Sequence, residues 1–555
     1  MKGKDKIIYL VISFFLSFFS CATVKELQGG EKDKEPPKFL SSMPILGATK
    51  VSEKIKKIEL FFDKKIILKD LKKITISPPI EKAFDFLPKK LATKKLTIKP
   101  LIPLKSDTSY IINFGESIQD NTEGNKLSFF KYVFSTGEEV DSLVVEGILK
   151  DAYEDDIPKN ALVGLYRIEE DQKEFDEQRL FKEKPYYLTK ASKEGDYKLE
   201  NIKKGRYQLV AYTSNMKSNL IYDPKNEKLG FLSAIFLLEE NQVFSLSLSK
   251  ELLPFKFNEV KKKGPGVLDF SFDGPFDNIE IKADKNIERS AIVQGKDLIE
   301  YWYKFPSSSE YPSRIEFDIH KDGAFYEKVG VNLEKKPMDD KLEFSLKRKD
   351  EPIDPTSSIW FFSQRPLYDI KEDKIKIYDE KNQLISFKLI KDELDAKKIG
   401  LNFSKLFDAS YKVIFEQEAF EDILGAKNTE LSFKIKAGKE GDFGSLFVEL
   451  TKIPEHSFWL ELLNKKKEVV YKSYGKQLNH KISYIIPGEY KLRLIIDENE
   501  DKKWNPSNFI ERKQAEPVYY SHIITVKALW DLNQRWDFSI PSIKKETETE
   551  KKEEK

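Results

Sequence analysis

The stretch Lys57-Ile58-Glu59-Leu60-Phe61-Phe62 alternates polar and apolar side chains, and a related stretch returns 301 positions later in the 555-residue chain. Leu60 corresponds to Phe361 (361 − 60 = 301), and Phe61 corresponds to Phe362. The same offset joins Ile74 with Ile375, Ile76 with Ile377, Tyr110 with Tyr411, Phe114 with Phe415, Tyr132 with Phe433, Phe134 with Ile435 and Gly137 with Gly438. Because a slip of one residue turns a whole strand to its other face, this constant offset predicts two copies of one β-sandwich.

The rest of the chain has the same character. Short alternating runs such as 73–77, 109–114 and 131–134 lie between turn signals, which indicates antiparallel β structure. The 40 Phe and 24 Tyr residues suit strand cores. The expected fold class is all-β, a series of tandem antiparallel β-sandwich domains. The loop 120–125 is expected to match 421–426.

The two segments resemble the SbsA-type bacterial Ig-like domain. The resemblance rests on Ile58–Asp63, on Leu104–Tyr110 and on the closing Phe134-Ser135-Thr136-Gly137. The stretch 29–37, with Gly29-Gly30 and Pro36-Pro37, also resembles that of the Ig-like-domain lipoproteins common in the Bacteroidota. The resemblance implies a cell-envelope protein, placed in the outer membrane, and it supplies no catalytic residues.

A second kind of unit follows each Ig-like segment. Residues 146–151, 160–166 and 195–199 lead to Lys204-Gly205-Arg206-Tyr207-Gln208-Leu209, and Pro487-Gly488-Glu489-Tyr490-Lys491-Leu492 repeats that last strand. These units resemble the carboxypeptidase-regulatory or transthyretin-like β-sandwich. Residues 251–345 also read as strands, for example Val267–Phe272, but they resemble no family that we can name.

Cys21 is the only cysteine, and it follows three lysines and an apolar run from Ile7 to Phe19. A run of that length suits a signal peptide, whereas a transmembrane helix needs about 20 residues. Phe18-Phe19-Ser20-Cys21 resembles a lipobox, although Phe18 departs from its usual aliphatic residue. The sequence therefore predicts lipidation at Cys21. Cleavage without lipid and a buried free thiol are the alternatives.

These observations predict a domain plan in chain order. The expected segments are a signal peptide 1–20, a flexible tether 21–37, an SbsA-type Ig-like domain 38–138, a transthyretin-like sandwich 139–250, an unassigned β-rich module 251–345, a second Ig-like domain 346–438, a second transthyretin-like sandwich 439–541 and a disordered charged tail 542–555.

Charge argues against a nucleic-acid partner. The chain has 95 basic and 93 acidic residues, and removing residues 1–20 leaves 92 of each. A phosphate-binding protein would show a basic excess. The expected partners are membrane lipid, through acylated Cys21, and an unknown envelope protein or glycan.

Few residues point to chemistry. The four histidines have no metal-ligand spacing, and nucleophile-elbow and phosphate-loop motifs are absent from the sequence. Asp497, Asn499 and Asp501 have the alternate spacing of a Ca²⁺ loop, but Lys502 replaces the expected glycine. A polar Asx turn is the competing interpretation. No other cofactor is expected.

Four of the six tryptophans lie in the last hundred residues, and Trp504, Trp530 and Trp536 are candidates for stacking on sugar rings. Burial in a core is the competing interpretation. We therefore expect a non-enzymatic, lipid-anchored envelope protein that acts as a scaffold or spacer. A glycan- or protein-binding lipoprotein using the C-terminal sandwich is the alternative, and a carboxylate-dependent hydrolase is a third hypothesis.

Overall fold

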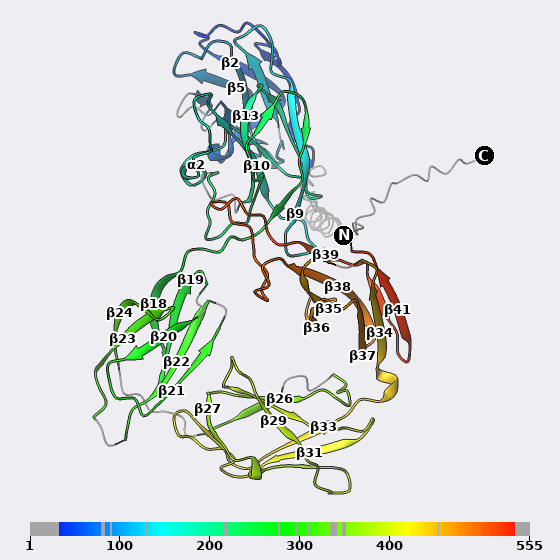
Figure 1. The fold of residues 1–555 in the computed structure, drawn as a ribbon. Coiled ribbons are helices and arrows are strands. Elements are labelled where there is room, and N and C mark those ends of the chain that lie inside the picture. The colour runs from blue at the N-terminus through cyan, green and yellow to red at the C-terminus, as the bar shows by residue number, and fades with distance from the viewer. Residues whose placement is uncertain are drawn as a thin grey trace, which may run out of the picture.

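A computed structural model describes residues 33–538 except 79–83, 89–90, 128–129, 215–219, 276–277, 296, 308–309, 334–340, 347–350 and 453. Of the described residues, 51% are in strands and 3% in helices. The strands form five β-sandwiches in succession, called here the first to the fifth sandwich (Figure 1). The predicted all-β, tandem-sandwich fold class is confirmed. Cys21 lies outside the described residues.

The first sandwich packs a sheet in the order β1-β2-β5-β4, with β7 also on β2, against the sheet β3-β6-β8. Its elements are β1 (Phe39–Met43), β2 (Ile58–Leu68), the 3₁₀ turn η1 (Leu71–Lys73), β3 (Thr75–Ser77), β4 (Phe84–Leu87), β5 (Thr93–Pro100), β6 (Ser109–Asn113), β7 (Ile118–Asp120) and β8 (Lys131–Ser135). Leu60, Tyr110 and Phe134 are fully buried in the core between the sheets.

The fourth sandwich repeats this order, with sheets β25-β26-β30-β29 and β28-β31-β33 and the pair β27-β32. Its elements are β25 (Phe344–Leu346), β26 (Ile359–Ser363), β27 (Leu367–Ile370), η2 (Glu372–Lys374), β28 (Ile375–Tyr378), β29 (Lys388–Lys391), β30 (Lys398–Asn402), β31 (Ser410–Phe415), β32 (Phe420–Asp422) and β33 (Leu431–Lys436). Phe361, Tyr411 and Ile435 are buried together, as the offset of 301 predicts.

The registers of the two copies also agree. Tyr110 pairs with Phe134, and Tyr411 pairs with Ile435. The loop match needs correcting by one residue, because Asp120 and Asp422 hold equivalent turns. The Asp120 carboxylate accepts N–H bonds from Glu123 and Gly124, and that of Asp422 accepts one from Ala426. The offset there is 302.

The third sandwich has sheets β18-β19-β22-β21 and β20-β23-β24. Its strands are β18 (Lys256–Gly264), β19 (Val267–Asp273), β20 (Ile279–Ala283), β21 (Arg289–Gln294), β22 (Leu298–Lys304), β23 (Arg314–Lys321) and β24 (Ala324–Asn332). Lettered in chain order, these sheets read ABED and CFG, the order of a constant-type immunoglobulin domain. The module without a recognised family therefore has the same strand order as the first and fourth sandwiches.

The second and fifth sandwiches share another order. The sheets are β11-β10-β13-β14 and β12-β9-β16 in one, and β36-β35-β38-β39 and β37-β34-β41 in the other. The second contains β9 (Leu143–Asp151), β10 (Ala161–Ile168), α2 (Gln178–Lys182), β11 (Tyr187–Lys190), β12 (Asp196–Ile202), β13 (Gly205–Thr213), β14 (Leu229–Phe231), β15 (Phe236–Leu238), β16 (Gln242–Val243) and β17 (Leu246–Leu248). The fifth contains η3 (Glu440–Asp442), β34 (Gly444–Leu450), β35 (Ser457–Asn464), β36 (Val469–Gly475), β37 (Asn479–Ile485), β38 (Gly488–Asp497), β39 (Val518–Tyr520), β40 (Ile524–Val526) and β41 (Asp531–Trp536).

In both of these sandwiches, the first strand pairs in parallel with the last. β9 pairs with β16 and β17, and β34 pairs with β41. A further strand lies on the long strand of the other sheet, β15 on β13 and β40 on β38. The two units are therefore copies of one topology.

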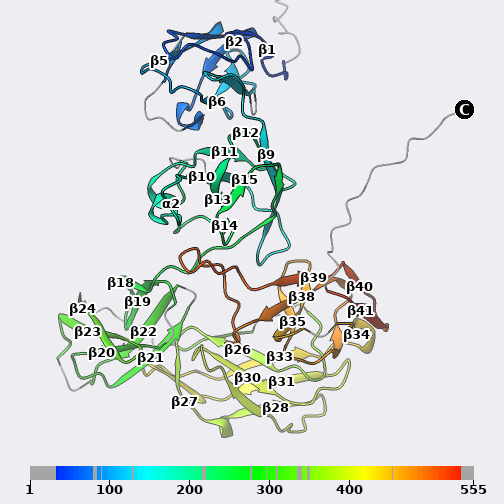
Figure 2. The same cartoon turned by 45° about the horizontal axis from the view of Figure 1, so that its top comes forward.

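The five sandwiches do not form a straight rod. The first and second are stacked, and the third, fourth and fifth form an arc that brings the fifth back beside the second (Figures 1 and 2). Glu300 joins the third and fourth by accepting a 2.8 Å bond from Lys397. Burial opposes ionisation of Glu300, but hydrogen bonds from Lys263, Lys397 and Trp302 outweigh it and lower its pKa to about 2.

Two expected boundaries differ from the structure. Residues 33–37 fall within the predicted flexible tether, but Asp33 pairs with Lys64 at 2.5 Å, and its carbonyl accepts a bond from Asn125. The described end of the tether therefore lies against the first sandwich. The boundary at 345/346 falls inside β25, which pairs with β26, so the fourth sandwich begins before residue 346.

Candidate functional site

A long connection of the fifth sandwich, residues 498–517 between β38 and β39, reaches the second sandwich. Figure 2 shows it beside β14. We call it the docking loop. Its base is held by Glu516, whose carboxylate accepts N–H bonds of 2.8 Å from Glu498 and from Asn505. Burial raises the pKa of Glu516.

The tip of the docking loop inserts an aromatic side chain into the second sandwich. Phe509 is 1% exposed, and its ring centroid lies 4.9 Å from that of Phe231 and 5.9 Å from that of Phe175. It belongs to the same buried cluster as Val210 and Tyr212 of β13. The fifth sandwich thus completes part of the second sandwich's core.

Polar groups fix this tip in place. The Phe509 N–H donates to Glu251 at 2.5 Å, and Tyr222 donates its hydroxyl to the same carboxylate at 3.4 Å. Burial raises the pKa of Glu251. The Ser507 N–H donates to the Ser249 hydroxyl at 2.9 Å, and the two hydroxyl oxygens are 2.7 Å apart. Main-chain bonds at a buried tip define one position of the loop, because leaving them unmade would be costly.

Arg512 covers the inserted ring. Its guanidinium carbon lies 4.3 Å from the Phe509 centroid. It donates to Gln208 at 3.2 Å and to Glu177 at 3.1 Å, both in the second sandwich. Gln514 donates to the Phe231 carbonyl at 3.0 Å. Cation–π contact and charge-assisted bonds therefore add to the apolar insertion.

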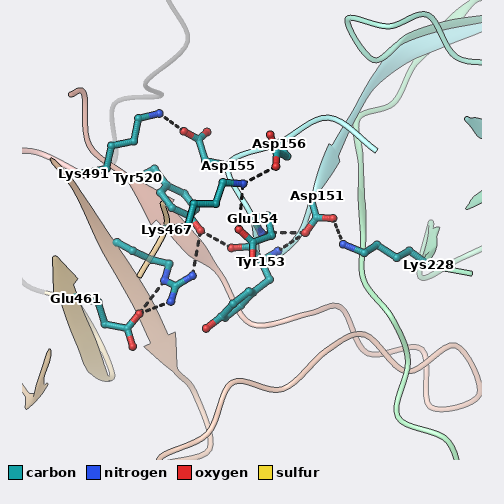
Figure 3. A network of polar contacts seen from close by, with 11 residues as sticks. Asp151, Tyr153, Glu154, Asp155, Asp156, Lys228, Glu461, Lys467, Lys491 and Tyr520 are labelled. Carbon is teal, nitrogen blue, oxygen red and sulfur yellow. Dashed lines mark hydrogen bonds and ion pairs between the residues drawn. The ribbon is translucent and has the colours of Figure 1, made fainter. Parts of the chain in front are cut away.

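An acidic turn of the second sandwich faces basic residues of the fifth (Figure 3). The turn, residues 151–156, is shaped by Asp151, which accepts N–H bonds from Tyr153 at 3.0 Å and Glu154 at 2.9 Å. Lys467 pairs with Asp156 at 2.5 Å and with Glu154 at 3.4 Å. Lys491 pairs with Asp155. The side chains of these pairs are between one-third and two-thirds exposed, so the pairs orient the contact more than they stabilise it.

Behind the turn lies a buried pair. Arg493 donates to Glu461 at 2.8 and 2.5 Å, and its guanidinium lies 4.5 Å from the centre of the Tyr153 ring. Tyr520 donates its hydroxyl to the Tyr153 carbonyl at 2.6 Å (Figure 3). Burial raises the pKa of Tyr520 to about 12, so its hydroxyl stays a donor at neutral pH.

The three residues of the expected calcium loop lie at the base of the docking loop. Asp497 is fully buried, and its carboxylate accepts bonds from the Asp501 N–H, the Lys502 N–H and the Tyr474 hydroxyl. Asn499 donates to Asp501 at 3.1 Å. These are the bonds of the Asx-turn interpretation. Across the described residues, no group of three or more His, Cys, Asp or Glu side chains is arranged for a metal. Calcium binding stays a prediction.

The three candidate tryptophans lie in different surroundings. Trp504 packs on Tyr153 at 4.7 Å and donates to the Glu516 carbonyl, so it belongs to the junction of the two sandwiches. Trp536 is buried in the core of the fifth sandwich. For Trp536, the structure replaces the sugar-stacking expectation with packing. Trp504 is half-buried, and sugar stacking there stays a prediction. Trp530 is the exposed one of the three, at 54%, and Lys527 lies over its ring.

A cleft of about 620 Å³ lies between the fourth and fifth sandwiches. Its lining includes Trp360 and Phe362 from β26, Ser357, Lys398 from β30 and Glu468 from the fifth sandwich. The Trp360 ring lies across Gly400, where a Cβ atom would come within 3.1 Å of it. Phe362 and Trp360 point away from the core, because Phe361 between them points inward.

Sequence reasoning missed Phe509 and Arg512. The available signal was the length of the connection between two strands, 20 residues from 498 to 517, because connections of that length are uncommon without a role. The arrangement found here is suited to holding domains together.

Comparison with known family models agrees with the description of the first sandwich. Residues 33–136 match the family model described as a bacterial Ig-like domain. No curated protein matches the chain. Over the described residues, no helix has the length and apolar character needed to cross a membrane.

Among solved structures, the chain is similar to the Bacillus anthracis TIE protein at 10% identity, covering 92% of this chain and 76% of that one, with a TM-score of 0.14. The S-layer protein rSbsC gives 8% identity, 84% and 66% coverage and a TM-score of 0.15. The Bacteroides ovatus SGBP-B in complex with mixed-linkage heptasaccharide gives 10% identity, 69% and 95% coverage and a TM-score of 0.19. Likenesses at these TM-scores say nothing about the function of the chain.

Proposed function

We propose that this chain is a non-enzymatic scaffold of the bacterial cell envelope, tethered by lipid at Cys21. The observation that carries the proposal is the insertion of Phe509 into the second sandwich, because it joins units that are far apart in the sequence. A spacer has no need of a contact that returns the fifth sandwich to the second, because that contact shortens the chain of sandwiches. A scaffold that presents several faces in fixed positions depends on it.

The proposed lipid anchor is supported by the sequence around Cys21 and by the bacterial Ig-like match of the first sandwich. Acyl chains contribute about 0.8 kcal/mol per buried CH₂, and stable attachment needs more than one chain. A triacylated cysteine would meet that need. Outer-membrane placement in a Bacteroidota-type envelope is part of the same proposal.

The test compares wild type and Cys21→Ser in a bacterial host, using radiolabelled palmitate and fractionation. Wild type should incorporate label and pellet with membranes, whereas Cys21→Ser should take up no label and leave the pellet after a salt wash. An unlabelled wild-type chain would exclude lipid anchoring. The folded state of both chains, measured by circular dichroism, is the control.

A second candidate is glycan binding in the cleft between the fourth and fifth sandwiches. Trp360 lines the cleft beside the hydroxyl of Ser357 and the carboxylate of Glu468. The Lys398 ammonium lies 4.2 Å from the centre of the Trp360 ring. This mixture of aromatic and polar groups suits a sugar ring. Calorimetric titration with cellohexaose, laminarihexaose, xylohexaose and maltohexaose tests it. Trp360→Ala should weaken binding roughly tenfold or more, while Trp530→Ala should not change it. No heat with any of the four sugars would count against this candidate.

A further inference from the structure

Charge is divided unequally between the first sandwich and the rest of the chain. Residues 33–138 contain 20 lysines, no arginine and 13 acidic residues, a net charge of +7. Residues 139–555 contain 70 basic and 77 acidic residues, a net charge of −7. The near-neutral total therefore conceals a basic N-terminal sandwich on an acidic body.

Part of this charge lies on the sheet that faces away from the second sandwich. In Figure 2, β6 lies toward the second sandwich, and β1, β2 and β5 lie on the far side. The outer face of that sheet carries Glu59, which pairs with Thr97 across the strands. Lys95 and Lys99 flank Thr97 two residues away on the same strand, so they share this face. Lys95 pairs with Glu59 at 2.9 Å, and Lys99 lies across from Asp85 of β4. Both lysines are exposed.

One end of the same sheet carries exposed apolar side chains. Met43, paired with Glu59 and so on the outer face, is 69% exposed, and Ile45, two residues later where the chain leaves β1 toward β8, is 71% exposed. Leu101, directly after β5, is 59% exposed. Ile58 at the start of β2 pairs with Ile98 near the end of β5, so both sets lie toward one end of the sheet. Lys54 and Lys56, just before β2, are exposed there.

The first sandwich is also the unit next to the expected anchor. The described chain begins at Asp33, which Lys64 holds against this sandwich. Cys21 lies 12 residues earlier, and a fully extended segment of that length spans about 40 Å. That is close to the length of β2, whose 11 residues rise about 36 Å. The tether is therefore long enough for the sandwich to lie against the bilayer that holds the anchor.

We propose that the outer face of β1-β2-β5 is a membrane-contact surface for anionic phospholipid headgroups. Lys54, Lys56 and Lys99 attract the phosphates, and Met43 and Ile45 enter the interface between headgroups and acyl chains. The acidic remainder of the chain is repelled from the same surface, so the contact sets the orientation of the whole scaffold. That this surface lies next to a membrane in the cell rests on the proposed lipid anchoring, whereas its affinity for a bilayer does not.

The experiment uses the mature chain carrying Cys21→Ser, which has no lipid, and vesicles of phosphatidylethanolamine that contain phosphatidylglycerol as the anionic lipid. Cosedimentation at low salt should show binding, and binding should fall as salt is raised, since the attraction is screened. Lys54→Glu/Lys56→Glu/Lys99→Glu should lower vesicle affinity on the order of 100-fold. Met43→Asp/Ile45→Asp should lower it roughly tenfold or more.

Matched variants in the fourth sandwich provide the controls. Lys388→Glu/Lys391→Glu/Lys434→Glu changes net charge equally, and Leu394→Asp/Leu406→Asp replaces residues that are 68% and 75% exposed. Both should bind vesicles like the parent. Four outcomes would each overturn the proposed membrane-contact surface. These are no binding of the parent to anionic vesicles, equal binding to phosphatidylcholine vesicles, equal losses in the control variants, and equally tight binding to polyglutamate. Palmitate labelling of Cys21 would be unaffected by any of these results, so the two proposals fail separately.

Discussion

The second and fifth sandwiches have the same strand order, yet one receives the docking loop and the other supplies it. Their cores match in detail. Tyr207 donates to the Lys203 carbonyl at 2.7 Å, and Tyr490 donates to the Ile486 carbonyl at 2.5 Å, each four residues back. The connections after the long strands do not match. In the second, Leu220 stays on its own sandwich, accepting a bond from Tyr212, whereas in the fifth the docking loop leaves.

The difference shows that core and assembly are set by different parts of the sequence. Alternating strand residues fix each sandwich, and they repeat because both copies bury the same faces. The docking loop is free of that constraint, since the backbone N–H groups at its tip, those of Ser507 and Phe509, bond to the other sandwich. A change in the strands should therefore affect either copy alike, whereas a change in the loop should affect only the contact between them.

The strongest effect is expected for the two equivalent tyrosines. Tyr207→Ala and Tyr490→Ala each remove a buried ring and its hydroxyl bond, which costs about 3–5 kcal/mol of unfolding free energy. Calorimetric unfolding of the full chain should show a lower unfolding temperature for the second sandwich in Tyr207→Ala and for the fifth sandwich in Tyr490→Ala, by similar amounts. Tolerance of one substitution and not the other would contradict the equivalence of the two cores.

Phe509→Ala should follow, at about 3–5 kcal/mol by the same cavity argument, because it removes a buried ring but no side-chain hydrogen bond. It should act on the contact rather than on the fifth sandwich itself. Hydrogen exchange should increase in β14 and around Phe231, and the transition of the fifth sandwich should change little. The neighbouring Ile510 is 70% exposed, so Ile510→Ala is the matched control and should leave exchange unchanged.

The contact should also respond to pH through Glu251. Burial raises its pKa, so the docked state binds a proton more readily than the undocked chain. The added stability is complete below the ordinary carboxyl pKa and is lost as pH rises through the raised value. Exchange at the Phe509 amide, corrected for its intrinsic rate, should slow from pH 7 to pH 5. Glu251→Gln keeps an acceptor and should remove this dependence.

The smallest effect is expected for the exposed ion pairs. Lys467→Ala/Lys491→Ala removes the pairs with the acidic turn, each contributing about 0–1 kcal/mol. The parent should lose a similar amount in high salt, and the variant should show less sensitivity to salt. A loss as large as that of Phe509→Ala would mean that charge, not insertion, holds the two sandwiches together.

The sequence predicted the parts that follow a simple period. The offset of 301 identified the buried pairs Leu60–Phe361 and Tyr110–Tyr411, because strand alternation is local and a slip would expose the core. It did not predict the docking of Phe509. Nothing local distinguishes an apolar residue that fills another domain from one that stays exposed, as Ile510 does. The same limit explains Trp504, whose partner Tyr153 lies 351 positions away (504 − 153 = 351).

The most direct test of the fold-back is a disulfide across it. The hydroxyl oxygens of Ser249 and Ser507 are 2.7 Å apart, so the two side chains already meet across the contact. Because Cys21 is the only cysteine, Ser249→Cys/Ser507→Cys in a Cys21→Ser chain contains only the designed pair. Mild oxidation should give a monomeric chain with no free thiol and faster migration on non-reducing gels. Persistent free thiols, or only disulfide-linked dimers, would contradict the docking of the fifth sandwich on the second.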